Sequence, residues 1–391
     1  MKKQSIAIIG GAGHVGAPLG IALANRGYKT TLIDLNKKNN QIINSGKMPF
    51  LEDGCEKILR KNLSKNMIFA TNDYAEIKKN KIIIIAIGTN IKSNFKPELK
   101  KFLNFFHFLK KKINRKQSIV IRSSIYPGAY DKVYSIIKSK CKNLTYCPER
   151  IAQGKSILEL PKIAQIISGK NVKEIKKISK IFNQISRKVI VTDVLEAELI
   201  KLFSNTYRYI NFSIANQFYT MCNELGLDYE KLRLLMKDSY SRNNNIPKAG
   251  FTRGPCLLKD TMQLSSFFNN KFKLLNEARN INEDIPKVIF KNLKLKYKLK
   301  TKTVGILGLT FKADNDDIRD SLSLKLLNLF KKNNIKVLAS DEYYKKAGLL
   351  DKKELVNKSD IIIIATGHKE YKKIKISKNK IVIDIWNILK D

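Results

Sequence analysis

The chain contains few histidines and cysteines, and neither kind is spaced for metal binding or pairing. Its 391 residues include three histidines and five cysteines. The cysteines are odd in number and widely separated, and the histidines lie far apart, whereas metal sites and disulfide frameworks have short characteristic spacings. We therefore expect neither a metal site nor a disulfide framework.

Long apolar runs are also missing. The longest, residues 82–88 and 361–366, are much shorter than the roughly 20 residues that a membrane-spanning helix needs. Runs of this length are typical of buried parallel strands. The lysines at the N-terminus are followed by a few apolar residues and then glycines, without the longer apolar core of a signal peptide. We expect a cytoplasmic protein without membrane contact.

Acidic residues are scarce, at 34 against 75 basic ones, which gives a net charge of +41. A basic excess of this size attracts nucleic acids without sequence preference. However, lysine greatly outnumbers arginine, on which phosphate and base recognition draw heavily. The lysines are also spread over every segment instead of forming one basic stretch. A nucleic-acid-binding protein on an enzyme-like scaffold is therefore the less favoured alternative.

The longest regular pattern lies in residues 195–226, where apolar residues recur every three or four positions and predict one long helix that ends at Gly226. A polar stripe of Glu198, Lys201, Asn205 and Arg208 shares another face. Such a stripe is either a solvated face or the lining of a cleft. We favour the cleft, because the helix joins two α/β-patterned regions and is apolar over most of its circumference.

The N-terminal region has the pattern of a dinucleotide-binding unit. An apolar strand at residues 5–10 leads into a glycine-rich turn and a helix to residue 26, and the next strand ends in Asp34. This arrangement predicts a pyrophosphate on the helix start and a ribose hydroxyl on Asp34, which would repel a 2′-phosphate and so favour NAD over NADP. The turn consists of Gly11, Ala12, Gly13, His14, Val15 and Gly16.

Further strands and helices alternate up to residue 192, and small or polar residues follow three of the strands. These residues are Gly88, Thr89, Ser123, Ser124, Glu149 and Arg150. Because ligands bind at the carboxyl ends of parallel strands, we expect these residues to edge the same crevice as the glycine turn. Glu149 follows a proline at a strand end, where a carboxylate suits acid–base chemistry or a substrate contact.

Cys256 has a different setting from the other cysteines. It follows Gly-Pro at a predicted helix start, with Lys259 one turn further on, and such settings activate thiols as nucleophiles. We interpret Cys55, Cys141 and Cys222 as small buried apolar residues. A second α/β region begins at residue 303 without a glycine fingerprint, so it is predicted to hold a different nucleotide.

Taken together, these motifs resemble the UDP-glucose/GDP-mannose dehydrogenases, the nucleotide-sugar 6-dehydrogenases, over essentially the whole chain. The matching segments, in the family's order, are GAGHVG, IAIGTN, SSIYPG, CPER, the helix with Lys201 and Asn205, GPCLLKD and GLTFKADNDDIRDS. The resemblance implies an α/β protein with an N-terminal Rossmann NAD domain (1–192), a central helical domain (193–300) and a C-terminal Rossmann-like UDP domain (301–391). It also implies a homodimer that pairs through the long central helix.

The resemblance further implies two successive NAD-dependent oxidations of a sugar hydroxymethyl group to a carboxylate. Cys256 would form a thiohemiacetal and then a thioester, Lys201 and Asn205 would stabilise oxyanions, and Asp260 would act on the catalytic water. Glu149 would be the acid–base carboxylate, and Ser124 stands where the family has threonine. Further cofactor contacts would come from Gly88, Thr89, Ser123, Lys259 and Arg319. Substrate contacts would come from Glu149, Arg150, Lys201, Asn205, Gly250, Phe251, Arg253, Phe311 and Lys312.

The sugar is left open by two motifs that point to different branches of the family. CPER resembles the enzymes of UDP-N-acetylhexosamines such as UDP-N-acetylmannosamine, whereas Lys259-Asp260 resembles the UDP-glucose branch. We favour the N-acetyl sugar, with UDP-glucose as the alternative. Arg253 replaces a family glycine, so the sugar loop is expected to differ in shape or charge. A single-step hydroxy-acid dehydrogenase would need neither Cys256 nor the second α/β region.

Overall fold

A computed structural model of the chain describes residues 3–92 and 95–389. The chain divides into two compact units, Met1–Phe203 and Ser204–Asp391, and each is described separately. Among the described residues, no helix combines the length and the apolar character needed to cross a lipid bilayer. The predicted division into three domains at residues 192 and 300 stays a prediction.

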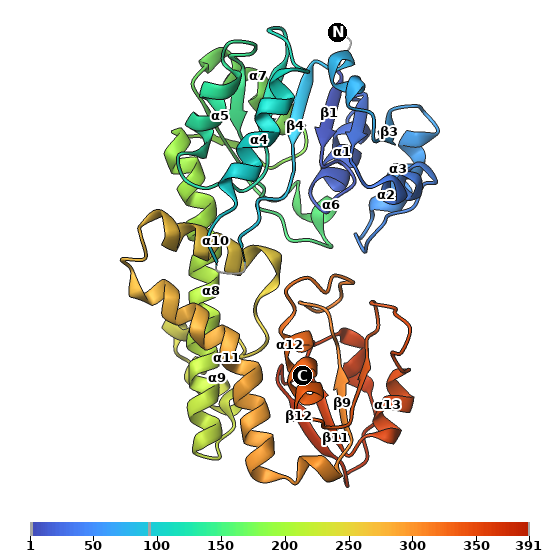
Figure 1. Cartoon of the computed structure of the whole chain (residues 1–391), viewed down its shortest axis with the longest axis vertical. Helices are drawn as coiled ribbons and strands as arrows, with labels where there is room; N and C mark the ends of the chain where they lie inside the picture. Colours follow the sequence, from blue (N-terminus) through green and yellow to red (C-terminus); the bar gives the residue numbers. More distant parts are fainter. Residues whose placement is uncertain (1–2, 93–94, 390–391) are drawn as a thin grey trace. The chain divides into compact units, whose positions relative to one another are not determined.

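The described residues of the first unit form an α/β structure around one eight-stranded sheet, in the order β3-β2-β1-β4-β5-β6-β7-β8 (Figure 1). The strands are β1 Ile6–Ile9, β2 Thr30–Ile33, β3 Ile68–Thr71, β4 Ile82–Ile85, β5 Ser118–Ile121, β6 Leu144–Tyr146, β7 Gln165–Gly169 and β8 Val189–Val191. The helices are α1 Gly16–Asn25, α2 Lys37–Asn44, α3 Cys55–Leu63, η1 Tyr74–Lys79, α4 Leu99–Lys110, α5 Ala129–Ile137, α6 Ser156–Glu159 and α7 Val172–Phe182.

Helices cover both faces of this sheet, which explains why its central strands are continuously apolar. Along β1, Ile6 and Ile8 belong to a core with α1, α3 and α7, while Ala7 and Ile9 belong to a second core with α4 and α5. Successive side chains of a strand point to opposite faces, so a strand covered on both sides must be apolar throughout. The predicted Rossmann architecture of this region is confirmed.

Two strands run against the direction expected from regular strand–helix alternation. β6 and β7 pair antiparallel, while β7 and β8 pair parallel. The segment between β6 and β7 contains only the short helix α6, whereas a parallel crossover usually uses a full helix to return across the sheet. Without such a return, the chain enters β7 from the carboxyl edge of β6. Glu52 holds this segment by accepting hydrogen bonds from the backbone N–H groups of Gly154 and Ser156.

The long helix α8, Val194–Glu224, is confirmed close to its predicted bounds, but its faces are buried in an unexpected way. The polar residues Glu198, Lys201 and Asn205 are buried, as the cleft interpretation requires, whereas Arg208 is exposed. Part of the apolar stripe is exposed instead, including Ile214 at 45%. The helix therefore uses polar side chains for contacts within the chain and leaves apolar ones on its surface.

The second unit combines helices with a four-stranded parallel sheet in the order β10-β9-β11-β12, counted over its described residues (Figure 1). Its further helices are α9 Tyr229–Lys237, η2 Ser241–Asn243, α10 Gly254–Phe267, α11 Lys273–Lys296, η3 Leu299–Thr301, α12 Leu322–Lys332, α13 Lys352–Lys358 and η4 Lys369–Lys373. The strands are β9 Val304–Leu307, β10 Val337–Ser340, β11 Ile361–Ile364 and β12 Ile381–Asp384.

Helix α11 was not predicted from the sequence. It carries Pro286 in its interior, and a proline there normally interrupts a helix. Buried residues nevertheless recur at helical spacing along it, and Ile285, Ile289 and Leu293 share a core with Val304 of β9. Packing of this apolar face against the C-terminal sheet offsets the hydrogen bond that the proline removes.

Glu198 is a buried carboxylate that connects α8 to the start of α5. Its two oxygens accept hydrogen bonds from the backbone N–H groups of Gly128 (2.7 Å) and Tyr130 (3.0 Å). Burial raises the pKa of Glu198 from 4.5 to about 7, although both hydrogen bonds act in the opposite direction. The folded chain therefore holds this proton to a higher pH than the unfolded chain does.

This difference predicts a pH-dependent stability contribution that Glu198→Gln removes. As the pH rises from about 4.5 to about 7, the wild type should lose roughly 3 kcal/mol of unfolding free energy relative to the variant, because its folded state binds more protons over this range. Urea unfolding of both proteins at several pH values measures the difference. Glu224→Gln, at the exposed end of the same helix, is the control, and parallel curves for wild type and Glu198→Gln would contradict the prediction.

Candidate active site

The glycine turn after β1 is shaped by close backbone approaches at two of its glycines. A Cβ atom on Gly11 would lie 2.6 Å from the Ile8 carbonyl oxygen, and one on Gly16 would collide with the Gly10 carbonyl oxygen. A Cβ on Gly13 would come no closer than 3.4 Å to any atom of the protein. The packing of the turn thus requires Gly11 and Gly16, while the space at Gly13 stays open for a ligand.

Asp34 lies at the end of β2 in a fixed orientation. Its Oδ2 accepts a hydrogen bond from Ala12 N–H (3.1 Å), and its Oδ1 accepts one from Asn36 N–H (3.0 Å). These bonds hold the carboxylate beside the glycine turn, as expected for a group that accepts from a ribose hydroxyl. The chemistry of the turn and of Asp34 fits a bound dinucleotide with an unphosphorylated ribose.

The polar residues that follow β4 and β5 lie together, as predicted from their positions at strand ends. The Thr89 hydroxyl donates a hydrogen bond to the Ser124 carbonyl oxygen, and the Ser123 hydroxyl donates one to the Ile87 carbonyl oxygen (2.6 Å). These bonds join the two strand-end segments. They form part of the same edge of the sheet as Gly11, because β4 is a parallel neighbour of β1 and β5 is a parallel neighbour of β4.

Glu149 lies beyond the end of β6 and is paired with a residue that sequence analysis missed. The Arg122 side chain is fully buried and donates hydrogen bonds to Glu149 Oε2 from Nε (3.0 Å) and from Nη2 (2.7 Å). The available signal was a single arginine directly after the apolar strand β5. Such a residue is rarely buried without a partner, so it indicated a carboxylate nearby.

The five cysteines, all in the described part of the chain, differ sharply in exposure. Four of them are buried and Cys256 is exposed. Burial raises the pKa of Cys147 to about 11, which keeps its thiol protonated. Cys256 lies in the first turn of α10, so the predicted helix start is confirmed. Among the described residues, no group of histidine, cysteine and acidic side chains is arranged to hold a metal ion.

Asp260 contacts two other predicted site residues of the second unit, Asn205 and Lys259. It is fully buried on α10, one turn after Cys256, and its Oδ2 accepts a hydrogen bond from Asn205 Nδ2 at 2.6 Å. The Lys259 ammonium pairs with its Oδ1 at 3.0 Å. Lys201 precedes Asn205 by one turn of α8 and so shares its face. Asp260, Asn205 and Lys259 therefore form one polar cluster beside the start of α10.

The loop before Cys256 is held by buried amides that sequence analysis also missed. Asn216 of α8 accepts a hydrogen bond from Gly250 N–H (2.9 Å) and donates one to the Gly250 carbonyl oxygen (3.1 Å). The same Nδ2 donates to Asn282 Oδ1 of α11 at 2.8 Å. The Trp386 ring lies against Gly250 so closely that a Cβ there would be 2.5 Å from it. Only a glycine fits this position.

Arg253 is neutralised by carboxylates of the same unit. Its Nε lies 3.0 Å from Glu283 Oε1, and its Nη2 lies 3.6 Å from Asp320 Oδ1. Glu283 also pairs with Lys325 of α12 at 3.4 Å. The positive charge that replaces a family glycine is thus compensated locally, and it ties the cysteine loop to α11.

The loop between β9 and α12 carries Phe311, Lys312 and Arg319, and it contacts the start of α10. A Cβ on Gly254 would collide with the Phe311 ring, so the ring packs directly on the first residue of that helix. The Arg319 guanidinium is held by the carboxylate of Asp317. These contacts bring Phe311 close to the cysteine-bearing helix, whereas Arg319 has an acidic partner within its own loop.

Asp341 and His368 fix the beginning of this loop. Asp341, just after β10, accepts hydrogen bonds from the N–H groups of Leu309 (2.6 Å) and Thr310 (3.2 Å). His368 is fully buried, and its Nδ1 accepts a hydrogen bond from Asp314 N–H at 2.9 Å. Its Nε2 therefore carries the proton and faces Asp341 Oδ2 at 3.3 Å. Neither residue was singled out from the sequence.

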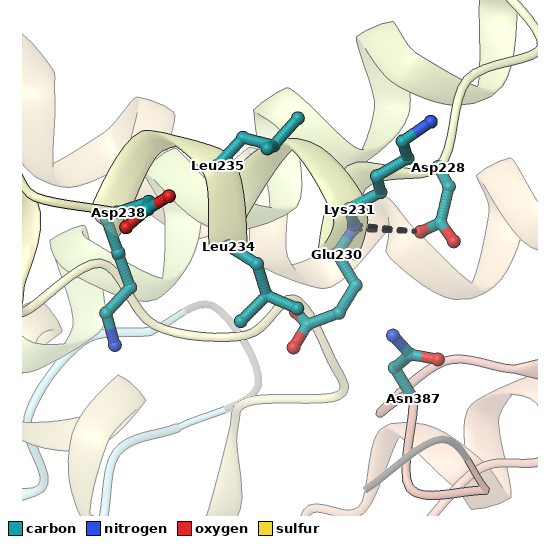
Figure 2. A pocket seen from close by; sticks show the side chains of 8 residues that line it. Asp228, Glu230, Lys231, Leu234, Leu235, Asp238 and Asn387 are labelled. Atoms are coloured by element: carbon teal, nitrogen blue, oxygen red, sulfur yellow. Dashed lines mark hydrogen bonds between the residues drawn. The ribbon is translucent and has the colours of Figure 1, made fainter.

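A hollow beside α9 is separate from all of these residues. Figure 2 shows its lining, which includes Asp228, Leu234, Leu235 and Asn387, and its volume is about 740 Å³. The Asp228 carboxylate caps α9 by accepting a hydrogen bond from Lys231 N–H. None of the predicted site residues lines this hollow, so it is not the candidate active site.

Comparison with known proteins decides the family. Models of the UDP-glucose/GDP-mannose dehydrogenase family match as its NAD binding domain at residues 4–186, its central domain at 195–284 and its UDP binding domain at 305–391. The chain is 32% identical to a UDP-N-acetyl-D-mannosamine dehydrogenase of Methanococcus vannielii, over 99% of this chain and 94% of the relative. The chain belongs to this family. It is an NAD-dependent dehydrogenase of the nucleotide-sugar class.

Two other proteins extend this comparison within the UDP-glucose/GDP-mannose dehydrogenase family. The solved structure of a UDP-D-ManNAc dehydrogenase from Pyrococcus horikoshii superposes with a TM-score of 0.89 at 27% identity, covering 98% of this chain and 96% of that one. A UDP-glucose 6-dehydrogenase of Rickettsia felis is 28% identical over 97% of this chain and 91% of the relative. The predicted fold class and family are confirmed.

The glycine turn predicts different effects for two alanine substitutions. Gly16→Ala should lower both the melting temperature and the affinity for NAD, because its Cβ collides with backbone. Gly13→Ala should leave the melting temperature nearly unchanged but weaken NAD binding about tenfold or more, because its Cβ occupies the space where the pyrophosphate approaches. Calorimetric titration with NAD and thermal unfolding measure the two effects. Full NAD affinity in Gly13→Ala would show that the pyrophosphate lies elsewhere.

Proposed function

We propose that the enzyme oxidises the C6 hydroxymethyl group of UDP-N-acetyl-D-mannosamine to the uronate in two NAD-dependent steps. The observation that carries this proposal is the exposed Cys256 in the first turn of α10, next to the buried cluster of Asp260, Asn205 and Lys259. A single alcohol oxidation needs no such thiol. The name of the relative from Methanococcus vannielii supports the N-acetyl sugar.

In the first oxidation, Glu149 takes the proton of the sugar hydroxyl as the C6 carbon loses a hydride. NAD, when bound by the glycine turn and Asp34, accepts the hydride in each oxidation. Breaking the O–H and C–H bonds leaves an aldehyde. The backbone N–H groups at the start of α1 would hold the pyrophosphate and orient the cofactor for this transfer.

In the second oxidation, the Cys256 thiolate adds to the aldehyde carbon and forms a thiohemiacetal, from which the second hydride leaves. The oxygen of the adduct bears negative charge, and the Lys201 ammonium with the Asn205 amide stabilises it. Loss of the hydride gives a thioester. Asp260, acting with Lys201, then removes a proton from the attacking water, and hydrolysis releases the carboxylate and the free thiol.

UDP-glucose is the second candidate substrate. It is supported by the Lys259-Asp260 pair after the cysteine and by the similarity to the UDP-glucose 6-dehydrogenase of Rickettsia felis. The fold and the chemistry would be the same for both sugars. The two sugars differ only at C2, where the N-acetyl sugar carries an axial acetamido group and glucose carries an equatorial hydroxyl, so a comparison of substrates distinguishes them.

We further propose that the enzyme is a homodimer that pairs through α8. Four apolar side chains of this helix lie on its surface at helical spacing: Tyr207 (64% exposed), Ile214 (45%), Phe218 (37%) and Met221 (49%). We name them the α8 stripe. A continuous apolar stripe on a long helix is typical of a surface that packs against another subunit.

Counting NADH for each sugar tests the reaction. With UDP-N-acetyl-D-mannosamine, the enzyme should release two NADH per sugar, and UDP-glucose, UDP-N-acetylglucosamine and GDP-mannose should react more slowly. Cys256→Ser should lower the rate of the second oxidation about a thousandfold or more, because an alkoxide is not available at neutral pH. Absorbance of NADH with limiting sugar measures the yield.

The control is Cys147→Ser, which should keep two NADH per sugar because the Cys147 thiol is buried and protonated. Inactivity of Cys147→Ser together with full activity of Cys256→Ser would show that Cys256 is not the nucleophile. Two NADH per UDP-glucose, with none from the N-acetyl sugars, would keep the mechanism and change the substrate.

The dimer proposal predicts that Ile214→Glu dissociates the protein, because a carboxylate would be buried without a partner at the centre of the interface. Sedimentation equilibrium should give a dimer for the wild type and a monomer for the variant. Leu295→Glu, at a more exposed apolar position (75%) on α11 outside the α8 stripe, should stay dimeric. A monomeric wild type would contradict the proposal.

A further inference from the structure

Arg122 is among the largest side chains of the chain that have no exposed surface. It follows β5 directly. At this strand end, sequence analysis had assigned functional roles to the two serines after it and none to the arginine. Burying an arginine costs several kcal/mol unless every donor is satisfied. Its surroundings must therefore be built around the guanidinium group.

The guanidinium contacts the segment that follows β6 and also helix α7. Nε and Nη2 donate to Glu149 Oε2, while Nη1 donates to the Cys147 carbonyl oxygen (3.0 Å) and to the Cys147 Sγ (3.0 Å). Its plane lies over the Phe182 ring of α7, 5.2 Å from the centroid. With contacts on its edge and face, the arginine has one orientation.

Glu149 is saturated by donors. Its Oε1 accepts hydrogen bonds from the backbone N–H groups of Arg150 (2.7 Å) and Ile151 (3.0 Å), and its Oε2 accepts both bonds from Arg122. A carboxylate offers about four lone-pair sites, and all are used here. Hydrogen bonds of this kind, made to both oxygens at once, prevent rotation of the group.

The two oxygens are nevertheless different. Oε2 faces a cation that is itself fixed, whereas Oε1 faces neutral N–H groups of a turn. A proton can add to Oε1 at the loss of one neutral hydrogen bond, but adding it to Oε2 would oppose the guanidinium charge. In this unit, the Arg122 guanidinium, from the residue after β5, and the Cys147 thiol, from the residue after β6, both interact electrostatically with Glu149.

We propose that Arg122 is a positioning residue that holds Glu149 in one orientation and directs proton transfer to its Oε1. In the first oxidation the O–H bond of the sugar hydroxyl breaks, an O–H bond forms at Oε1, and the hydride leaves C6 for NAD. This inference rests on the proposed acid–base role of Glu149. It assigns to Arg122 the orientation and the charge that this role requires.

The pH dependence of kcat tests this role. Arg122→Met removes the cation, so the carboxylate should take up a proton more readily and the acid limb of the kcat profile should move to higher pH by about 1 to 2 units. Arg122→Lys keeps the charge without the fork, and its shift should be smaller. Profiles are measured between pH 5 and 9 at saturating NAD and sugar, since a structural defect alone would lower kcat without moving the limb.

The matched control is Arg115→Met, an exposed arginine of the same unit, whose profile should equal that of the wild type. Melting temperature and NAD affinity report folding for each variant. If Arg122→Met folds and binds NAD but keeps the wild-type acid limb, the inference is overturned. If Arg122→Met fails to fold, an unchanged acid limb in Arg122→Lys overturns it in the same way.

Glu149→Gln separates this inference from the reaction on which it rests. Loss of the first NADH in Glu149→Gln together with shifted limbs in the Arg122 variants supports both. Loss of activity in Glu149→Gln with unshifted Arg122 variants removes the inference and leaves the proposed function. Full activity of Glu149→Gln removes the acid–base role of Glu149 and the role of Arg122 with it.

Discussion

The placement of the reactive thiol depends on one side-chain amide. Asn216 binds both the N–H and the carbonyl group of Gly250, and it is held in turn by Asn282. Without this amide, two buried backbone groups would lose their partners, at a cost of about 1 to 3 kcal/mol each. The loop from Gly250 to Cys256 is therefore tied to α8 and α11 by this amide, and the Arg253–Glu283 ion pair and the Phe311 ring on Gly254 support the same loop.

The few carboxylates of this lysine-rich chain serve mainly as anchors for backbone. Asp34, Glu52, Glu149, Glu198 and Asp341 each accept hydrogen bonds from two backbone N–H groups at the beginning of a loop or helix. Such a bond immobilises one side chain, whereas an ion pair with lysine immobilises two. Carboxylates bound in this way position loops more firmly than surface ion pairs do.

Sequence patterns predicted what depends on local order. The strands, the glycine turn, the start of α10 and the 31-residue helix α8 follow from periodicity and capping within single segments. The direction of β7, the interior Pro286 of α11 and the contacts of Arg122 and Asn216 depend on residues distant in the sequence. Local sequence patterns do not identify such distant partners. The roles of Asp34, Glu149 and Cys256 came from local patterns, those of the other catalytic residues came from the family resemblance, and all of them stay predictions.

The excess of basic side chains has a kinetic consequence. Lysines and arginines outnumber the carboxylates, so a net charge of +41 makes the electric field outside the molecule positive. Attraction of this kind accelerates diffusional encounter with anions such as nucleotides, and it weakens as ionic strength shortens the Debye length to about 8 Å at physiological salt. A positive surface of this kind therefore favours the diffusional approach of the anionic nucleotides with which this enzyme family reacts.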